Sequence, residues 1–338
     1  MFEGDKISRS SQDEGICIMN LQTFTNVEEK RLAYEYEEAN TLLDVIDTLE
    51  KAHSNGSYFR GLADGSWKIY SSMQREWVTR ELSHQFENSY SKLISEFLKH
   101  IYEFSSLELK QHCKVINDIS IFSALQHYGA PTPIIDWTSD WKVALYFASD
   151  TNGLCFGNET SSFVSLYWLN DGKGAETPCN DLTDMGKMLE DFEQNQKDAG
   201  VDPSILNAIV KSFPSFDKWQ SLNWMITNKY RRFIDISNQR LALQDGAFTY
   251  VKDESLPLDN FFGKKDNLPK IHCLDIHKSV VPQIKKYLSD RGISKTSLGL
   301  DSDDWGKKAF HTFLSKYDIK SDFKLDVDEQ NNDTSAES

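Results

Sequence analysis

Apolar residues recur with helical spacing in five stretches of the chain, and charged residues lie between them. These stretches predict helices over 27–52, 78–104, 119–128, Asp140–Ser149 and 279–293. Ser139 is the expected N-cap of the fourth helix, and Gly292 lies where the fifth helix should end.

Other stretches carry alternating or continuous apolar residues bounded by turn-forming residues, a pattern typical of strands. The predicted strands are 57–61, 134–135, 161–170, 232–237, 246–251 and 270–277. Together with the helices they favour an α+β fold, in which a mainly antiparallel sheet is flanked by helices.

Changes in composition divide the chain into segments. We expect a polar N-terminal segment over 1–26, an N-terminal helix packed on the core over 27–54, and the main domain over 55–310. Within that domain, 171–225 is expected to be a loop and helical insertion. The stretch 321–338 is acidic and has one aromatic residue, which predicts a disordered tail.

Composition limits the function classes. Of the 338 residues, 39% are hydrophobic and 12% are aromatic, which suffices for a packed core. The formal net charge of -15 argues against a broad electrostatic contact with nucleic acid, because phosphate neutralisation needs clustered Lys and Arg. A local basic site stays possible.

The cysteines and the hydrophobic runs bear on location and metal binding. The five cysteines are scattered without a CxxC pair, so neither a zinc site nor a disulfide framework is expected. The start of the chain lacks an apolar secretion signal, and no run of about 18 apolar residues follows. We therefore expect a cytoplasmic protein with no membrane contact and no bound metal.

An arginine-glycine pair at a predicted strand end is the first candidate for ligand binding. The Arg60 guanidinium has five donors in a fixed fork that suits phosphate or carboxylate, and Gly61 allows close backbone approach. Arg75 follows on the next segment and can face the same side. The structural alternative is that Arg60 bridges buried carbonyls or a carboxylate and that Gly61 only makes a turn.

A dense polar segment, from Ser123 to Asp150, is the second candidate. It contributes the candidate binding residues Gln126, His127, Tyr128, Asp136, Trp137, Thr138 and Ser139. Pro131 and Pro133 stiffen the turn that separates residues 126–128 from residues 136–139. Alternatively, Asp136 pairs with an arginine, Trp137 belongs to the core, and the two hydroxyl residues only cap a helix.

A third candidate segment is 239–251, where Arg240, Gln244 and Gly246 lie just before or within a predicted strand. Glycine again permits a close approach of ligand or backbone. A plain hairpin turn with an exposed glutamine is the alternative. No P-loop, GxGxxG, HExxH or GxSxG motif occurs elsewhere in the chain.

These three segments resemble the FRG domain family, named for its Phe-Arg-Gly signature. The residues that carry the resemblance are Phe59-Arg60-Gly61, the stretch 126–148, and Arg240, Gln244, Gly246 and Phe248. The resemblance extends over roughly 55–306. Pro133 is a departure, because the family often has a basic residue there, so any ligand contact of that residue is lost or moved.

The resemblance implies a split-sheet core similar to that of ADP-ribosyltransferases, with NAD as a substrate. It implies catalytic roles for Arg60, Thr138 and Gln244. It implies NAD contacts from Gly61, Arg75, Gln126, His127, Tyr128, Asp136, Trp137, Ser139 and Tyr146. Transferases of this type usually carry a glutamate at the third catalytic position, and a glutamine cannot ionise to take its place.

Two functions from different classes follow. The first is an NAD-consuming ADP-ribosyltransferase-like or glycohydrolase-like effector, in a phage-defence or toxin setting, with a macromolecular target and an inhibitor or antitoxin partner. The second is a non-catalytic module that recognises a nucleotide or a nucleic acid. A scaffold without a ligand is the third reading, and it predicts that Arg60, Gln126, Asp136 and Gln244 lie far apart.

Overall fold

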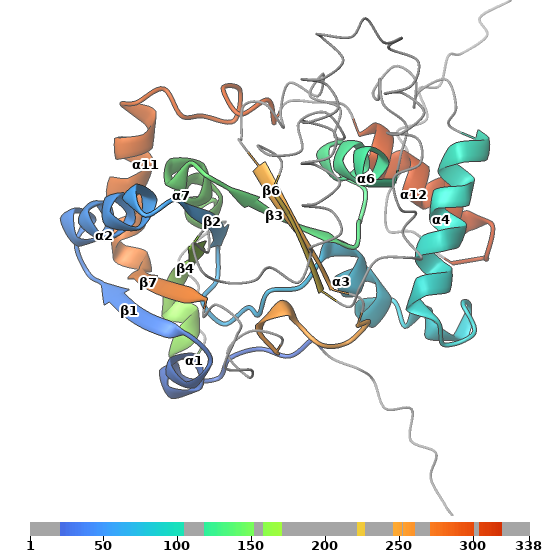
Figure 1. The fold of residues 1–338 in the computed structure, drawn as a ribbon, viewed down its shortest axis with the longest axis horizontal. Helices are drawn as coiled ribbons and strands as arrows, with labels where there is room; N and C mark the ends of the chain where they lie inside the picture. Colours follow the sequence, from blue (N-terminus) through green and yellow to red (C-terminus); the bar gives the residue numbers. More distant parts are fainter. Residues whose placement is uncertain are drawn as a thin grey trace, which may run out of the picture.

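The computed structural model describes residues 21–104, 118–151, 158–170, 222–226, 246–251, 253–260, 271–300 and 304–319. Its α-helices are α1 (Val27–Ala33), α2 (Leu42–Ser54), α3 (Ser72–Thr79), α4 (Tyr90–Phe104), α6 (Asp118–His127), α7 (Trp141–Ser149), α11 (Val281–Ser289) and α12 (Trp305–Ser315). Its strands are β1 (Glu35–Ala39), β2 (Ser57–Leu62), β3 (Ile134–Thr138), β4 (Phe163–Asn170), β5 (Leu222–Ile226), β6 (Gly246–Val251) and β7 (His272–His277). The α+β class is confirmed (Figure 1).

Several predicted segments lie outside the described residues. These are 1–20, the predicted strand 232–237, the tail 321–338, and the part of the 171–225 insertion that precedes β5. β5 itself corrects the expectation of loops and helices there, because it pairs with β6 as a strand. The strands predicted over 246–251 and 270–277 are confirmed as β6 and β7.

The seven strands form one sheet in the order β1-β7-β4-β2-β3-β6-β5. β1 runs parallel to β7, whereas the other neighbouring strands are antiparallel. The sheet is therefore mixed, and the expectation of a mainly antiparallel sheet is corrected. The parallel pair arises from a segment that the apolar spacing had assigned to a helix.

The sheet is almost divided at its middle. β2 pairs with β4 along its whole length, from Ser57 to Leu62, but it pairs with β3 at one position, where Phe59 lies opposite Thr138. β3 in turn pairs with β6 along its whole length. We call the point where these two halves meet the β2–β3 junction.

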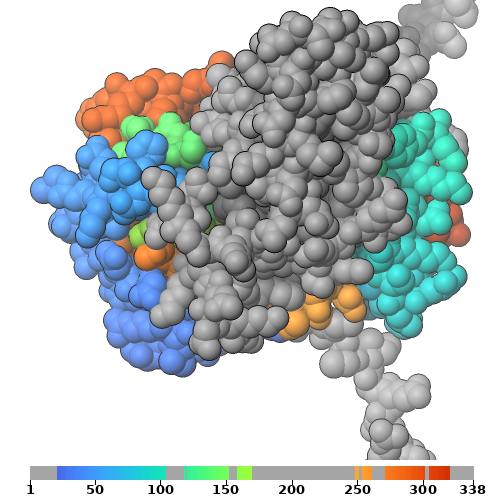
Figure 2. All heavy atoms as spheres, in the orientation of Figure 1, coloured from blue at the N-terminus to red at the C-terminus, as the bar shows by residue number. Residues whose placement is uncertain are grey.

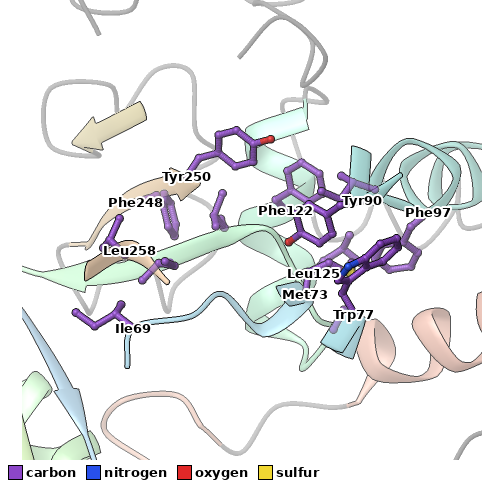
Figure 3. Packing of buried hydrophobic residues seen from close by; sticks show 14 of the residues in the cluster. Ile69, Met73, Trp77, Tyr90, Phe97, Phe122, Leu125, Phe248, Tyr250 and Leu258 are labelled. Atoms are coloured by element: carbon purple, nitrogen blue, oxygen red, sulfur yellow. The ribbon is translucent and has the colours of Figure 1, made fainter. Parts of the chain in front are cut away.

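Two hydrophobic cores pack on the sheet, and they contact opposite faces of β2, β4 and β7. One contains buried residues of α2, α7 and α11 packed on β1, β7, β4 and β2, among them Val45, Phe59, Trp141, Leu145, Leu166, Ile276 and Ile284. The other contains residues of α3, α4, α6 and α12 packed on β3 and β6, among them Met73, Trp77, Tyr90, Phe97, Phe122, Leu125, Phe248 and Tyr250 (Figure 3). In the space-filling view, α2 and α4 lie at opposite sides of the molecule (Figure 2).

The helix predicted over 27–52 is wrong as a single element. The structure divides it into α1, β1 and α2, with Thr41 as the N-cap of α2 because its side chain accepts a hydrogen bond from the Asp44 amide. β1 is an edge strand with mainly exposed residues, held by parallel pairing with the buried β7. Pairing with a neighbour here outweighs local helical propensity.

The helix predicted over 78–104 is also shorter than expected. α4 begins at Tyr90, and α3 ends at Thr79. Between them, Glu81, Glu87 and Asn88 have positive φ angles, which an α-helix does not allow. The interruption turns α4 away from α3, so that both pack on the same core.

α12 is a helix that the sequence patterns did not single out, and it crosses the predicted domain boundary at 310. Its buried residues Phe310, Phe313 and Leu314 have helical spacing and pack into the core with α4 and α6. Gly306 lets it approach closely, because a Cβ there would lie 2.6 Å from the carbonyl oxygen of Leu125. The first turn of α12 therefore lies against the end of α6.

A buried ion pair holds α1 on the sheet. Lys30 of α1 and Asp275 of β7 have no exposed side-chain surface, and their Nζ and Oδ1 atoms lie 2.5 Å apart. Lys30 Nζ also donates to the Gly65 carbonyl at 3.0 Å and to Ser165 Oγ at 2.9 Å. Tyr36 donates its hydroxyl to Asp275 Oδ2 at 3.1 Å. Both charges are thus compensated by hydrogen bonds, as burial requires.

Asp259 is a second buried acid, and it connects the 253–260 segment to the rest of the fold. Its carboxylate accepts hydrogen bonds from the Tyr34 hydroxyl and, at 2.9 Å, from the Ile69 amide. Burial raises the pKa of Asp259 from 3.8 to about 7, although the hydrogen bond from Ile69 opposes the shift. The neutral form is therefore favoured in the folded protein at mildly acidic pH.

This raised pKa predicts a pH dependence of stability. Because the folded pKa exceeds the unfolded one, the stabilisation is complete below about pH 4 and is lost as pH rises through about 7. Relative to Asp259→Asn, the free energy of unfolding of the wild type should fall across that window by at most about 1.4 kcal/mol per pH unit. Urea denaturation of both proteins from pH 4 to 8 measures it. A difference that is constant with pH would contradict the assignment.

Candidate functional site

Arg60 lies at the β2–β3 junction, one residue after the single pair that joins the two halves of the sheet. Its neighbours Phe59 and Gly61 face α7, so alternation places its side chain on the opposite face of β2. Arg60 Nη1 donates to the backbone carbonyl of Asp136 at 2.7 Å, across the junction. The structural alternative to ligand binding, in which Arg60 bonds a backbone carbonyl, is thus observed for this one contact.

The hydrogen bonding of the rest of the Arg60 guanidinium is unusual. Its Nε atom is buried and has no hydrogen-bond partner among the residues that the structure describes. A buried donor without a partner costs about 1–3 kcal/mol, so native structures rarely keep one without a reason such as a ligand, an ion or water. Burial lowers the pKa of Arg60 to about 10, and at neutral pH the side chain stays cationic.

Arg75 brings a second cation to this region from α3. Its Nη1 atom donates to the Tyr70 carbonyl at 3.0 Å, and solvent reaches the side chain. Surrounding protein nevertheless lowers the pKa of Arg75, while Glu76 and Asp136 raise it. The charge of Arg75 also lowers the pKa of Arg60, so the two guanidiniums act on each other.

Asp136 is the acid of this region, and Gln126 holds its carboxylate. Gln126 Nε2 donates to Asp136 Oδ2 at 2.5 Å, and Gln126 Oε1 accepts from the Thr132 hydroxyl at 2.5 Å. The amide orientation is consistent with both contacts, since its NH₂ faces an acceptor and its oxygen faces a donor. The Asp136 charge raises the pKa of both Arg60 and Arg75.

Four of the predicted site residues therefore come together at the junction. We call Arg60, Arg75, Gln126 and Asp136 the junction cluster; they come from β2, α3, α6 and β3. The cluster carries two guanidiniums and one carboxylate. Such an arrangement suits a phosphate or carboxylate ligand that also has hydroxyl groups.

Glycine is required at position 61 for a structural reason that the sequence pattern did not reveal. A Cβ at this position would lie 1.9 Å from the Ala144 carbonyl oxygen and 2.7 Å from the Ala148 amide nitrogen, both in α7. The glycine therefore allows β2 and α7 to touch through their backbones. Its bare face is turned to the helix, and not to a ligand.

Thr138 and Ser139 are engaged at the start of α7. The Thr138 hydroxyl accepts a hydrogen bond from the Asp140 amide at 3.1 Å, and the Ser139 carbonyl lies 3.1 Å from His53 Nδ1. Asp140, whose side chain accepts from the Lys142 amide, is the N-cap, which corrects the expectation for Ser139.

Trp137 and Tyr146 pack in hydrophobic cores. Trp137 is 2% exposed, and its Nε1 donates to Thr249 Oγ1 at 3.0 Å, so it is a core residue with a satisfied donor. Tyr146 lies on α7 and packs against the core of α2, α7 and α11. That core lies on the face of β2 opposite Arg60, so Tyr146 is separated from the junction cluster.

Tyr128 packs against the start of α12, and His127 packs against Tyr128. Their rings pack edge to face, and Tyr128 packs in the same way against Trp305. The Tyr128 carbonyl also accepts a hydrogen bond from the Lys307 amide at 3.0 Å. These contacts give the two residues a role in docking α12 onto the end of α6.

The third predicted catalytic residue lies outside the described residues. Gln244 and Arg240 lie outside the described residues, and of their segment the structure describes β6. Gly246, the first residue of β6, pairs with Thr138 at the end of β3 that meets the junction. The chain thus returns to the junction two residues after Gln244.

Thr132 is the residue that sequence reasoning missed. It lies between Pro131 and Pro133 and is fully buried, and its hydroxyl binds Gln126 as described above. The family motif includes this threonine after Pro131, but neither the motif nor the turn pattern gave its hydroxyl a role.

A hollow of about 240 Å³ lies beside this region, between α3 and α12. Its lining consists of Glu76, Arg80, Gly129, Pro131, Lys307, Phe310 and His311. None of the predicted site residues is among them. Within the described ranges, no group of three or more His, Cys, Asp or Glu residues could hold a metal ion. No described helix is long and apolar enough to cross a membrane.

Comparison with known proteins agrees with the motif evidence. Residues 55–153 match the family described as the FRG domain. This segment contains all four residues of the junction cluster. Neither a curated protein nor a solved structure matches the chain.

Proposed function

Since the chain carries an FRG domain over residues 55–153, we propose that this domain binds a nucleotide at the junction cluster, with NAD as the first candidate. The observation that carries the proposal is the buried Arg60 Nε atom, which has no partner in the described part of the chain. An anionic ligand oxygen would complete its hydrogen bonding, and Arg75 would add a second positive charge on the side that solvent reaches.

The chemistry of the cluster matches the parts of a dinucleotide. Guanidinium groups bind phosphate oxygens through charge-assisted hydrogen bonds, which are about twice as strong as neutral ones. A carboxylate such as Asp136 accepts hydrogen bonds from ribose hydroxyls.

The proposed reaction is ADP-ribosyl transfer or NAD hydrolysis. The bond between nicotinamide and the ribose C1′ breaks, nicotinamide leaves with the bonding electrons, and an acceptor or water adds to C1′ and loses a proton to solvent. Arg60 would hold the phosphates or ribose so that the oxocarbenium-like transition state forms in a fixed position. Gln244 would orient the ribose or the acceptor, as the family resemblance implies.

Two features favour a second candidate, a recognition module without catalysis. Gln244 has a carboxamide where a carboxylate would stabilise the cation, and the Thr138 hydroxyl is used to begin α7. Such a module would bind a nucleotide or a short nucleic acid and keep the same arginines. A phage-defence or toxin role, with its target and inhibitor, is proposed from the family resemblance.

Titration calorimetry with NAD, ADP-ribose and a short RNA tests binding. Arg60→Ala should weaken the binding of NAD and ADP-ribose by about tenfold or more, because a hydrogen bond to a charged group contributes about 1.5–3 kcal/mol. Arg31→Ala is the matched control, since Arg31 lies on α1 and pairs with Glu28 and Glu38 at the surface. Measuring nicotinamide release from NAD distinguishes the two candidate functions, because the enzyme releases nicotinamide and the recognition module does not.

Absence of binding to both NAD and ADP-ribose would overturn the proposal. Equal affinities of the wild type and Arg60→Ala would overturn it as well, provided that circular dichroism shows both folded. Binding of RNA alone, with a steep salt dependence, would favour the recognition module.

A further inference from the structure

Thr132 connects three elements of the candidate site through its own polar atoms. Its amide donates to Ser72 Oγ at 2.9 Å, and its carbonyl accepts from the Met73 amide at 3.0 Å and from the Ser72 hydroxyl at 3.3 Å. Ser72 and Met73 form the start of α3, the helix that carries Arg75. The backbone of Thr132 is therefore fixed to the first turn of α3.

The side chain of Thr132 continues the connection in the other direction. Its hydroxyl donates to Gln126 Oε1, which leaves Gln126 Nε2 to face Asp136 Oδ2. The Asp136 carbonyl in turn accepts from Arg60. An unbroken chain of hydrogen bonds thus runs from α3 through Thr132 and Gln126 to β3, and across the junction to β2.

The orientation of the Gln126 side-chain amide depends on this series of hydrogen bonds. A glutamine amide can turn by 180°, which exchanges its donor and acceptor ends with little change in shape. With the Thr132 hydroxyl present, the observed orientation satisfies two hydrogen bonds. Without it, the Gln126 oxygen loses a donor, and the side chain has less reason to keep its NH₂ on Asp136.

We infer that Thr132 is a positioning residue: through Gln126 it fixes the Asp136 carboxylate relative to Arg60 and Arg75, and so sets the affinity of the junction cluster for its ligand. The inference rests on the proposed nucleotide-binding function. It deepens that function, because it names a residue that touches no ligand and yet controls binding.

The substitution Thr132→Val tests the inference, because valine keeps the shape and removes the hydroxyl. We expect NAD and ADP-ribose to bind about tenfold more weakly, whereas Thr132→Ser, which keeps the hydroxyl, should bind close to the wild type. Thr249→Val is the matched control, because it also removes a buried hydroxyl with a side-chain partner; the Thr249 hydroxyl accepts a hydrogen bond from Trp137 Nε1. It should leave the affinity unchanged.

A double-mutant cycle distinguishes positioning from a general loss of stability. If Thr132 acts through Gln126, Thr132→Val should weaken binding in the wild type and have no further effect in the Gln126→Ala background. Equal losses in both backgrounds would overturn the inference. So would unchanged affinity of Thr132→Val, or an equal loss in Thr249→Val.

Measuring the binding of inorganic pyrophosphate distinguishes failure of this inference from failure of the proposed function. If NAD and ADP-ribose do not bind, but pyrophosphate does and the cycle shows coupling between Thr132 and Gln126, the positioning role stands and the nucleotide proposal fails. If NAD binds and the cycle shows no coupling, the nucleotide proposal stands and the positioning role fails. If none of the three binds, both fail.

Discussion

Replacing Lys30 with methionine should lower the free energy of unfolding by about 3–5 kcal/mol, because it leaves the Asp275 carboxylate buried without its counter-charge. Neither side chain has exposed surface, and Lys30 supplies the hydrogen bonds that hold Gly65 and Ser165 near the carboxylate. Urea denaturation followed by circular dichroism measures the loss.

The neighbouring residue gives a matched control. Arg31 pairs with Glu28 and Glu38 at the surface, where its side chain is 52% exposed. Arg31→Met should cost less than about 1 kcal/mol, since solvent screens exposed pairs. In the Lys30→Met background, Asp275→Asn should recover part of the lost stability. Equal effects of the Lys30 and Arg31 substitutions would show that the buried pair contributes little.

Gly61→Ala is expected to destabilise the protein by about 3 kcal/mol, the upper end of the usual range for overpacking. Backbone atoms of α7 surround the added methyl group, at 1.9 Å from the Ala144 oxygen and 2.7 Å from the Ala148 nitrogen. Backbone cannot move aside as a flexible side chain does, so α7 would have to shift away from β2. The free energy of unfolding in urea again provides the measurement.

Gly292→Ala separates the clash from backbone strain. Gly292 has a φ of +73° but no atom within 4 Å of an added Cβ, so alanine there meets strain alone. We expect a cost of about 1–2 kcal/mol, the usual penalty for an L-residue in the left-handed region. If Gly61→Ala lowered the free energy of unfolding no more than Gly292→Ala does, close packing of β2 on α7 would not explain the glycine at position 61.

The sequence predicted the parts of the fold whose local pattern agrees with their environment. β2, β6 and β7 are buried or alternating apolar stretches, and each was expected within one or two residues of its bounds. β1 was not, because Glu35, Glu37 and Glu38 give an edge strand no apolar pattern. It exists through its pairing with β7, which no local signal reveals.

The same limit applies to the candidate site. Residue type identified Arg60, Arg75, Gln126 and Asp136, because guanidinium, amide and carboxylate groups are unusual on buried elements. Their packed neighbours could not be assigned in this way, since Trp137 and Tyr146 have plausible ligand chemistry but lie in hydrophobic cores. Thr132 acts through a contact six residues back in the chain, and only coordinates show such a contact.

An interrupted ladder leaves backbone amides and carbonyls exposed in the interior of a sheet, where an edge would not normally be found. Beyond Phe59, β2 keeps its bonds to β4 on one side and has no strand partner on the other, within the described strands. A buried main-chain polar group without a partner costs free energy, so any β2 amide or carbonyl that faces this gap needs a hydrogen bond from a side chain, water or a bound molecule.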